Sequence, residues 1–154
     1  MSRELGLHNL QVLDQLEEGD IVKFERGWFS HYGVYVGNTD IVHLMGDSPN
    51  ELLGTSQGIS VVKKENFWDV ANKSKAFKHN RDGVNFRPSD KKTIVNRAMS
   101  RVGDNSDYHV IYKNCEHFAN WCRYDAEDSS QVNVVLTTLA AVGFFIGAKF
   151  LGLR

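Results

Sequence analysis

Hydrophobic and polar residues alternate in the first part of the chain, which is the pattern of a half-buried β-sheet. The alternation runs through residues 19–24, 30–37 and 40–45, and a shorter stretch at 59–63 repeats it. A Gly-Asn-Thr sequence at 37–39 separates the second stretch from the third and predicts a tight turn. The sequence therefore predicts an antiparallel meander.

The spacing of the apolar residues becomes helical after this region. Five of them recur every three or four positions: Ile94, Val95, Ala98, Met99 and Val102. This spacing predicts a helix within 88–103, which Ser89 can cap and Gly103 can end in a left-handed conformation. Residues 107–112 resemble a short strand or turn.

A second helix is predicted over residues 115–124. Asn114 stands where an N-cap belongs, because its side chain can accept from the N–H of the second or third helical residue. Cys115, Phe118 and Cys122 fall on one face of this helix, which we assign to the core. Strands followed by helices indicate an α+β fold, an antiparallel sheet packed with helices.

The C-terminal residues differ from the rest of the chain. Residues 134–148 carry no charge, and only Lys149 interrupts the apolar sequence up to residue 153. A helix of about 20 residues spans the hydrocarbon core of a bilayer. We therefore expect a domain at 1–127 and a transmembrane anchor at 132–154, although a buried core helix would have the same composition.

The N-terminal residues lack the pattern of a signal peptide, so we expect a tail anchor with the domain in the cytosol. The charges around the anchor do not support this orientation. Lys149 and Arg154 follow the span and Glu127 and Asp128 precede it, which is the reverse of what the positive-inside rule requires.

Composition and charge exclude some classes of protein. The formal net charge is -1, which argues against a nucleic-acid partner. Basic residues cluster at 63–64, 73–81 and 91–92, but acidic residues lie among them, so we interpret them as solvated faces, with contact to anionic lipid headgroups as the lesser alternative.

The two cysteines, Cys115 and Cys122, are seven residues apart in a predicted helix, about 10 Å along its axis, which is too far for a disulfide. A reducing compartment is expected.

Cys115 is the candidate nucleophile. A thiol at the start of a helix faces backbone N–H groups and the positive end of the helix dipole, so we expect a favoured thiolate and an oxyanion hole formed with the backbone near Asn114 and Cys115. A lone cysteine at such a position is more often part of an inert core. A base in reach is what would distinguish a nucleophile.

His31 and His43 are the candidate bases, one on each arm of the predicted hairpin. Because side chains alternate along a strand, the even spacing places both on one face only if the loop has an odd number of residues. A three-residue loop at 36–38 would set the two histidines directly opposite each other, whereas a two-residue loop at 38–39 would put them on opposite faces.

If the two histidines share a face, they form a Cys-His-His site with Cys115. The remaining histidines, His8, His79, His109 and His117, are interpreted as surface or capping residues. A zinc site built from Cys115 and the two histidines is an alternative, but the short ligand pairs of common zinc sites are absent.

Several of these residues resemble the pattern of a known family. The block Asn114-Cys115-Glu116-His117-Phe118, followed by Arg123-Tyr124, resembles the signature of the lecithin:retinol acyltransferase family, and most closely its phospholipase A and acyltransferase branch. Further agreement lies at Gly19-Asp20, Ser30-His31-Tyr32, Tyr35-Val36-Gly37 and Val42-His43-Leu44, in the basic stretch 61–69 and in the apolar tail.

The resemblance implies a circularly permuted version of the papain-like fold of NlpC-type peptidases. It also implies that Cys115 is the nucleophile, His31 the general base and acid, and His43 the residue that orients His31, with no metal or cofactor. Departures from the family pattern at Tyr32 and at Trp121-Cys122 bear on the pocket wall and on acyl or headgroup preference.

The implied activity is that of a phospholipase A1/A2 and acyltransferase acting on membrane phospholipids. An acyl group would pass from a glycerophospholipid through a cysteine thioester to water, to the amine of phosphatidylethanolamine or to a lysophospholipid. Three alternatives stay open: an acyltransferase for retinol or another alcohol, a non-catalytic membrane adaptor, and a cysteine peptidase or amidase. The oligomeric state is left open.

Overall fold

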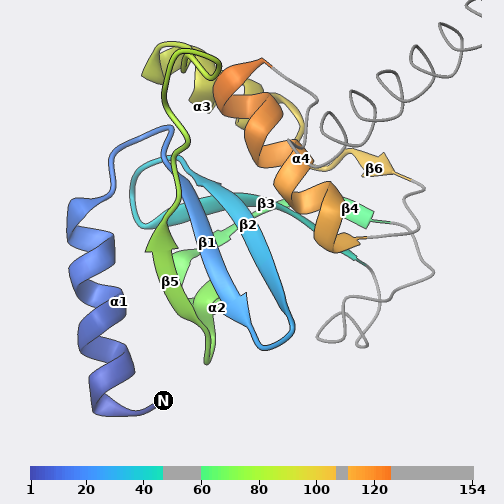
Figure 1. Ribbon diagram of the computed structural model, residues 1–154. Helices are drawn as coiled ribbons and strands as arrows, with labels where there is room; N and C mark the ends of the chain where they lie inside the picture. The colour runs from blue at the N-terminus through green and yellow to red at the C-terminus, as the bar shows by residue number, and fades with distance from the viewer. Residues whose placement is uncertain (47–59, 107–110, 126–154) are drawn as a thin grey trace, which may run out of the picture.

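The computed structural model describes residues 1–46, 60–106 and 111–125 (Figure 1). Over these residues the fold is α+β, as predicted. Four helices are described: α1 (Arg3–Gln15), α2 (Phe67–Ala71), α3 (Lys91–Ser100) and α4 (Ile111–Tyr124). Six strands form one antiparallel sheet: β1 (Ile21–Arg26), β2 (Phe29–Tyr35), β3 (Asp40–Gly46), β4 (Ser60–Asn66), β5 (Lys75–Lys78) and β6 (Asn105–Ser106). Their order across the sheet is β5-β1-β2-β3-β4-β6.

The four predicted strands correspond to β1–β4, which confirms the alternating pattern as the signal for the meander. The prediction for β4 was too short, because the strand continues from Lys63 to Asn66 through polar residues. These added residues pair with the start of β3, where Asp40 lies opposite Asn66 and Ile41 opposite Glu65. Pairing of the backbone, rather than hydrophobic alternation, extends this strand.

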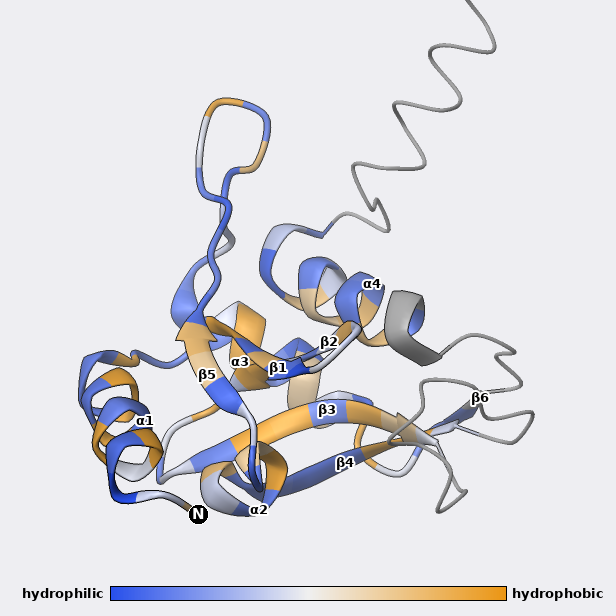
Figure 2. Cartoon of the chain, turned by 60° about the horizontal axis from the view of Figure 1, so that its bottom comes forward, coloured by the Kyte–Doolittle hydropathy of each residue, from blue (hydrophilic) through white to orange (hydrophobic). Residues whose placement is uncertain are grey.

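Helices cover both faces of the sheet, so that each face has a core of its own. On one face α3 and α4 pack against residues that include Ile21, Val34 and Val42. On the other face α1 and α2 pack against a cluster that includes Phe24 and Phe67. Figure 2 shows the same layering, with α4 above the sheet and α2 below it. We call the two sides the α4 face and the α2 face.

Helix α1, which the sequence analysis did not predict, lies along the outer edge of the sheet beside β5 (Figure 1). Ser2 caps it by accepting from the N–H of Leu5. The buried side chain of Asn9 donates to the carbonyl of Ser74 at 3.0 Å and accepts from the N–H of Ala76 at 2.9 Å. The helix therefore takes up backbone hydrogen bonds at the open side of an edge strand, which protects that edge from pairing with another chain.

The ends of α3 and α4 differ from the prediction. Asp90 rather than Ser89 caps α3, and its carboxylate accepts from the N–H of Thr93 at 2.9 Å. Helix α4 begins at Ile111, so Asn114 lies inside the helix and is not its N-cap. The expectation of a strand or turn up to residue 112 is wrong at its last two positions, which are helical, and positions 107–110 lie outside the described residues.

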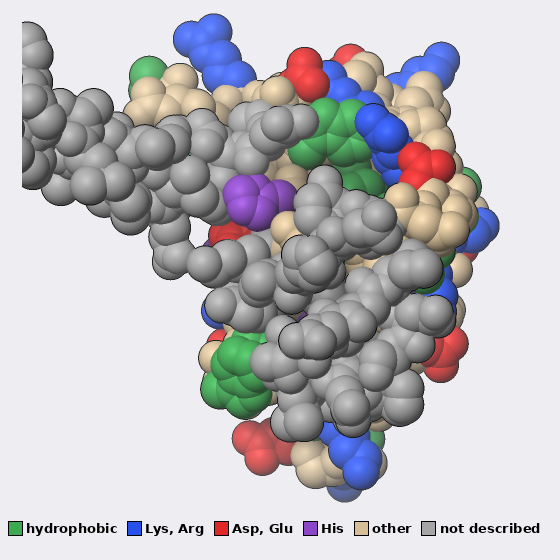
Figure 3. All heavy atoms as spheres, turned by 90° about the vertical axis from the view of Figure 1, so that its right-hand side faces the viewer, with side chains coloured by type: hydrophobic (Ala, Val, Ile, Leu, Met, Phe, Trp, Pro, Cys, Tyr) green, Lys and Arg blue, Asp and Glu red, His purple; other side chains and the backbone are tan. Residues whose placement is uncertain are grey.

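The expected anchor at 132–154 lies outside the described residues. Within residues 1–46, 60–106 and 111–125, no helix has the length and apolar composition to cross a bilayer. Figure 3 shows Lys and Arg side chains projecting among Asp and Glu around one side of the molecule, which is a mixed distribution of charge.

Candidate active site

The β2–β3 hairpin brings His31 and His43 to the same face of the sheet. Its loop has three residues, 37–39, because Val36 donates to the carbonyl of Asp40 at 3.0 Å and Asp40 donates to that of Gly37 at 2.9 Å. Gly37 has a φ of +89°, the left-handed conformation expected of a glycine in this loop. The odd loop keeps both histidines on one face, as a histidine pair requires.

The register differs from the prediction by two residues. Gly33, rather than His31, lies directly opposite His43, because the loop begins one residue later than 36. The two histidines are therefore diagonal neighbours. A Cβ on Gly33 would lie 3.1 Å from the Cβ of His43, closer than side-chain atoms normally approach. The missing side chain at Gly33 leaves room between the strands for the two imidazoles.

The imidazoles form a buried hydrogen-bonded chain that ends in a carboxylate. Nε2 of His31 lies 2.8 Å from Nδ1 of His43, and Nε2 of His43 lies 2.7 Å from Oε2 of Glu65. The exposed fractions of His31 and His43 are 5% and 1%, whereas the side chain of Glu65 is 38% exposed. The chain therefore starts in the interior, on the α2 face, and ends at water.

This environment disfavours positive charge on the histidines. Burial lowers the pKa of His31 well below its usual value, and the nearby His43 and Arg26 lower it further. Burial also lowers the pKa of His43, although the hydrogen bond to Glu65 opposes this shift. In turn that bond lowers the pKa of the Glu65 carboxyl. At neutral pH the chain therefore consists of two neutral imidazoles and an ionised carboxylate.

Cys115 contacts the backbone of β2 at the point where β2 and β3 separate. The pairing of these strands stops at Gly33 and His43, although β2 starts four residues before Gly33 and β3 continues to Gly46. The N–H of Tyr32, which a continued ladder would direct at β3, is hydrogen-bonded to the thiol of Cys115 instead. We call this position the fork.

The thiol at the fork therefore lies against the peptide bond that joins His31 to Tyr32. Cys115 comes from α4, on the α4 face, while the imidazole of His31 lies on the α2 face. The structure thus brings the candidate nucleophile on α4 to the backbone of β2 next to His31, and pairs His31 with His43 on β3.

The expectation of a favoured thiolate is wrong for the free protein. Burial raises the pKa of Cys115 to about 12, and the N–H groups of Tyr32 and Glu116 offset only part of that effect. Two features explain the difference. The side chain is fully buried, and the start of α4 at Ile111 removes Cys115 from the first helical turn, where the dipole acts most strongly. The resting state pairs a neutral thiol with neutral imidazoles.

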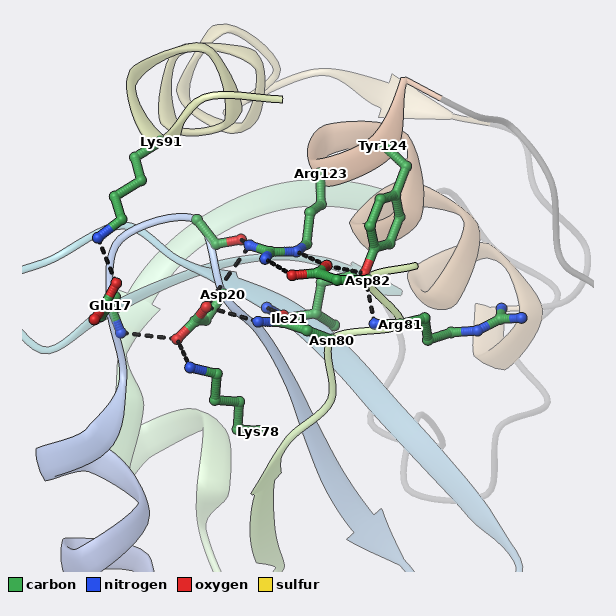
Figure 4. Close-up of polar contacts among 11 residues, drawn as sticks. Glu17, Asp20, Ile21, Lys78, Asn80, Arg81, Asp82, Lys91, Arg123 and Tyr124 are labelled. Carbon is green, nitrogen blue, oxygen red and sulfur yellow. Dashed lines mark hydrogen bonds and ion pairs between the residues drawn. The ribbon is translucent and has the colours of Figure 1, made fainter. Parts of the chain in front are cut away.

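A second, partly buried polar network fixes the far end of α4 (Figure 4). The guanidinium of Arg123 donates two bonds to Asp82, at 3.0 and 2.6 Å, and one to the carbonyl of Gly19 at 2.8 Å. The hydroxyl of Tyr124 donates to the same Asp82 at 2.8 Å and accepts from the N–H of Arg81. These contacts link α4 to the start of β1 and to the segment after β5.

Asp20 joins this network from the start of β1 (Figure 4). Its carboxylate accepts from the side chain of Asn80 and from the N–H of Glu17, both at 2.8 Å, and lies 3.0 Å from Nζ of Lys78. Arg123 is 3.6 Å away. We call the set formed by Asp20, Lys78, Asn80, Asp82, Arg123 and Tyr124 the arginine network.

The other histidines have different surroundings. Nε2 of His8 is 2.8 Å from the carbonyl of Ala76, and the ring centroid of His79 is 5.4 Å from that of Tyr32. His117 is half-buried on α4, and His109 lies outside the described residues. In the described part of the chain, no three side chains of the metal-binding types form a group suited to a metal ion. Cys115 and Cys122 are both free thiols.

Glu65 could not be recognised as a site residue from the sequence pattern alone. The predicted strand ended at Lys63, so Glu65 was not placed on the sheet at all. The even spacing of Lys63 and Glu65 was a usable signal, because side chains two positions apart lie on the same face of a strand. Lys63 pairs with His43, so Glu65 lies on the face of β4 that carries the histidine pair. What was missing was evidence that β4 extends that far.

Comparison with known proteins gives a consistent result. Residues 14–128 match the family model described as Lecithin retinol acyltransferase. The chain is 32% identical over 141 residues to Phospholipase A and acyltransferase 3 of Pongo abelii, covering 86% of each chain. It is 31% identical over 142 residues to human Phospholipase A and acyltransferase 2, covering 88% of each. It is also 25% identical over 158 residues to mouse Lecithin retinol acyltransferase, covering 89% of this chain and 67% of the relative.

Proposed function

The chain belongs to the lecithin retinol acyltransferase family, and from this premise we propose that it is a cysteine-dependent phospholipase A and acyltransferase. Cys115 is the nucleophile, His31 the general base and acid, and His43 the residue that orients His31. The observation that carries the proposal is the position of the Cys115 thiol at the fork, bonded to the peptide N–H that follows His31. Histidines on the sheet and a cysteine on a helix also support the expected circularly permuted papain-like fold.

The first half of the reaction transfers the acyl group to the enzyme. Sγ of Cys115 attacks the ester carbonyl carbon of a glycerophospholipid while its proton moves to His31. The tetrahedral intermediate collapses, the carbon–oxygen bond breaks, and the leaving alcohol takes the proton from His31 as the lysophospholipid departs. Because the resting thiol is neutral, proton removal and attack occur together instead of starting from a preformed ion pair.

The second half releases the acyl group. Water, the amine of phosphatidylethanolamine or the hydroxyl of a lysophospholipid attacks the thioester, and His31 accepts the proton of the attacking group. The carbon–sulfur bond breaks, and the departing sulfur recovers the proton. Of the backbone N–H groups that contact the sulfur, that of Tyr32 lies outside α4, so it is the candidate donor to an oxyanion formed there.

The substrate class has a consequence for the domain arrangement. We propose that residues 1–127 form the catalytic domain and that 132–154 anchor it to a membrane, with the catalytic domain in the cytosol. Confinement to the membrane surface would raise the effective concentration of an insoluble substrate. Deletion of 132–154 is expected to lower the rate on phospholipid vesicles far more than the rate on a soluble short-chain ester. An equal loss on both substrates would contradict the anchor.

The test of the function is intact-protein mass spectrometry after incubation with phosphatidylcholine vesicles. The wild type is expected to gain the mass of a fatty acyl group, and hydroxylamine should remove it because it cleaves thioesters. The variants Cys115→Ser and His31→Ala should lack this hydroxylamine-sensitive adduct. Cys122→Ser is the matched control, because that thiol is also buried on α4 but lies two turns from the fork.

Two results would overturn the proposal. An adduct that survives in Cys115→Ser but not in Cys122→Ser would move the nucleophile to the other cysteine. A wild type that forms no adduct and releases no lysophospholipid would favour the non-catalytic membrane adaptor. Addition of lysophospholipid, phosphatidylethanolamine or retinol as acceptors then identifies the product of an active enzyme.

A further inference from the structure

Glu65 gives the histidine chain a direction. A carboxylate can only accept, so the contact of 2.7 Å requires a proton on Nε2 of His43. A neutral imidazole carries one proton, so Nδ1 of His43 is then bare and must accept. Nε2 of His31 lies 2.8 Å from it and must therefore be the donor. The lone pair left on His31 is that of Nδ1.

We propose that Glu65 is a positioning residue that sets the tautomers of His43 and His31 in series and so leaves Nδ1 of His31 as the atom that accepts the Cys115 proton. Only the transfer of the Cys115 proton to Nδ1 of His31 rests on the proposed function. The order of protons along the chain follows from the distances and from the chemistry of a carboxylate.

Glu65 also acts after the proton has moved. When His31 becomes an imidazolium, its Nε2–H strengthens the bond to His43, and the charge of Glu65 stabilises the pair through the second ring. Carboxylate–histidine pairs hold catalytic and metal-binding imidazoles in this way, and loss of the outer partner typically costs about 10- to 100-fold. The 38% exposure of Glu65 fits this role, because water keeps the carboxylate ionised while the imidazoles stay dry.

The charged groups around the chain determine the pH test. His43 faces Glu65 and Lys63 on β4, His31 on β2 and Arg26 on β1. Lys63 and Arg26 both oppose protonation of His43, and Glu65 favours it. Loss of the Glu65 charge should therefore make the histidine pair harder to protonate, so that the base form persists to lower pH.

The experiment compares full-length Glu65→Gln with the wild type in detergent micelles containing phospholipid. We expect kcat to fall about 10- to 100-fold with little change in KM, because Glu65 acts on the base and not on the substrate. The acidic limb of the kcat profile should move to lower pH. A structural role would lower the rate without moving the limb.

Two further variants provide controls. Glu25→Gln makes the same chemical change at a half-exposed carboxylate of the sheet, which pairs with Lys23 at 3.7 Å, and should leave both kcat and the limb unchanged. Glu65→Asp keeps the charge on a shorter side chain, so its limb should stay at the wild-type position even where its rate is lower. A Glu65→Gln rate within twofold of the wild type, with an unmoved limb, overturns the inference.

A spectroscopic measurement separates failure of the inference from failure of the function. In ¹⁵N-labelled wild type at neutral pH, both histidines should show a protonated Nε2 and a bare Nδ1, whether or not the protein turns over. A protonated Nδ1 on His43 would reverse the order of the chain and refute the role of Glu65. The expected tautomers together with no thioester on Cys115 would refute the enzymatic function and leave the order of protons intact.

Discussion

The described part of the molecule contains two polar networks with buried members, and they differ in the kind of group that forms them. The histidine chain consists of two imidazoles and one carboxylate. The arginine network pairs a guanidinium with carboxylates (Figure 4), and the pKa of Arg123 is raised and that of Asp82 lowered by their mutual hydrogen bonds. At neutral pH Arg123 and Asp82 are therefore charged, whereas burial keeps both imidazoles neutral.

Because of this difference, the arginine network is suited to a structural role and the histidine chain to proton transfer. The raised pKa of Arg123 and the lowered pKa of Asp82 keep this pair charged at neutral pH, and Arg123 attaches α4 to the residue before β1. Arg123 is eight residues from Cys115 on the same helix, about 12 Å along its axis, so the attachment holds the thiol at the fork from a distance. The histidine chain contributes little to this attachment but can gain and lose a proton.

The largest expected effect comes from breaking the arginine network. Arg123→Met keeps a long apolar side chain but removes the donors to Asp82 and to the carbonyl of Gly19. We expect a loss of about 2 kcal/mol of unfolding free energy, because the carbonyl of Gly19 loses its charged donor and α4 loses its attachment to Asp82, which keeps its bond from Tyr124 and its contact with water. Urea denaturation measures it. Lys91→Met, which removes an exposed partner of Glu17, is the control.

The same variant tests the division of work. At urea concentrations below its unfolding midpoint, Arg123→Met should form the thioester at a rate per folded molecule within about threefold of the wild-type rate. His31→Ala should show the reverse behaviour, remaining folded without forming the thioester. A rate in Arg123→Met that falls as far as in His31→Ala would show that both networks serve catalysis directly.

A smaller effect is expected from mild acid. The folded histidines have lowered pKa values, whereas in the unfolded chain an imidazole titrates near 6.5. The contribution of the two histidines to the free energy of unfolding is therefore complete above about pH 6.5. It falls as the pH drops below this value, because only the unfolded state takes up protons readily. Each imidazole can contribute at most about 1.4 kcal/mol per pH unit.

Urea denaturation at pH 7.5 and 5.5 measures this dependence. The double variant His31→Gln/His43→Gln should lose most of it. Arg123→Met should keep it, because an aspartate titrates at about pH 3.9 even without a cationic partner, which is below this range. An unchanged pH dependence in the double variant would show that other groups cause the acid sensitivity.

The smallest effect is expected at the rim of the arginine network. Lys78 is 43% exposed, and it is one of several partners of Asp20, which keeps its bonds to Asn80 and to the N–H of Glu17. Lys78→Met should therefore change the unfolding free energy by about 0–1 kcal/mol. Differential scanning calorimetry against the wild type checks it. A loss as large as that of Arg123→Met would mean that the network's stability depends on its total charge.

The site residues illustrate how far sequence reasoning extends. His31 and His43 could be placed on one face because the loop between them is short and side-chain alternation is a local rule. The register was missed by two residues, because a loop at 36–38 and one at 37–39 are both odd and differ only in backbone hydrogen bonds. Cys115 was placed on the buried face of its helix by spacing alone, but its pKa was expected to shift in the wrong direction.

Local order in the chain thus determined the meander, the buried face of α4 and the shared face of the histidines, because each follows from the periodicity of a single element. The tertiary structure alone decided the fork, the bond from His43 to Glu65 and the attachment of Arg123 to Asp82. Those features join residues more than 20 positions apart. Their energies depend on burial and on strand pairing, which exist only after the elements have packed together.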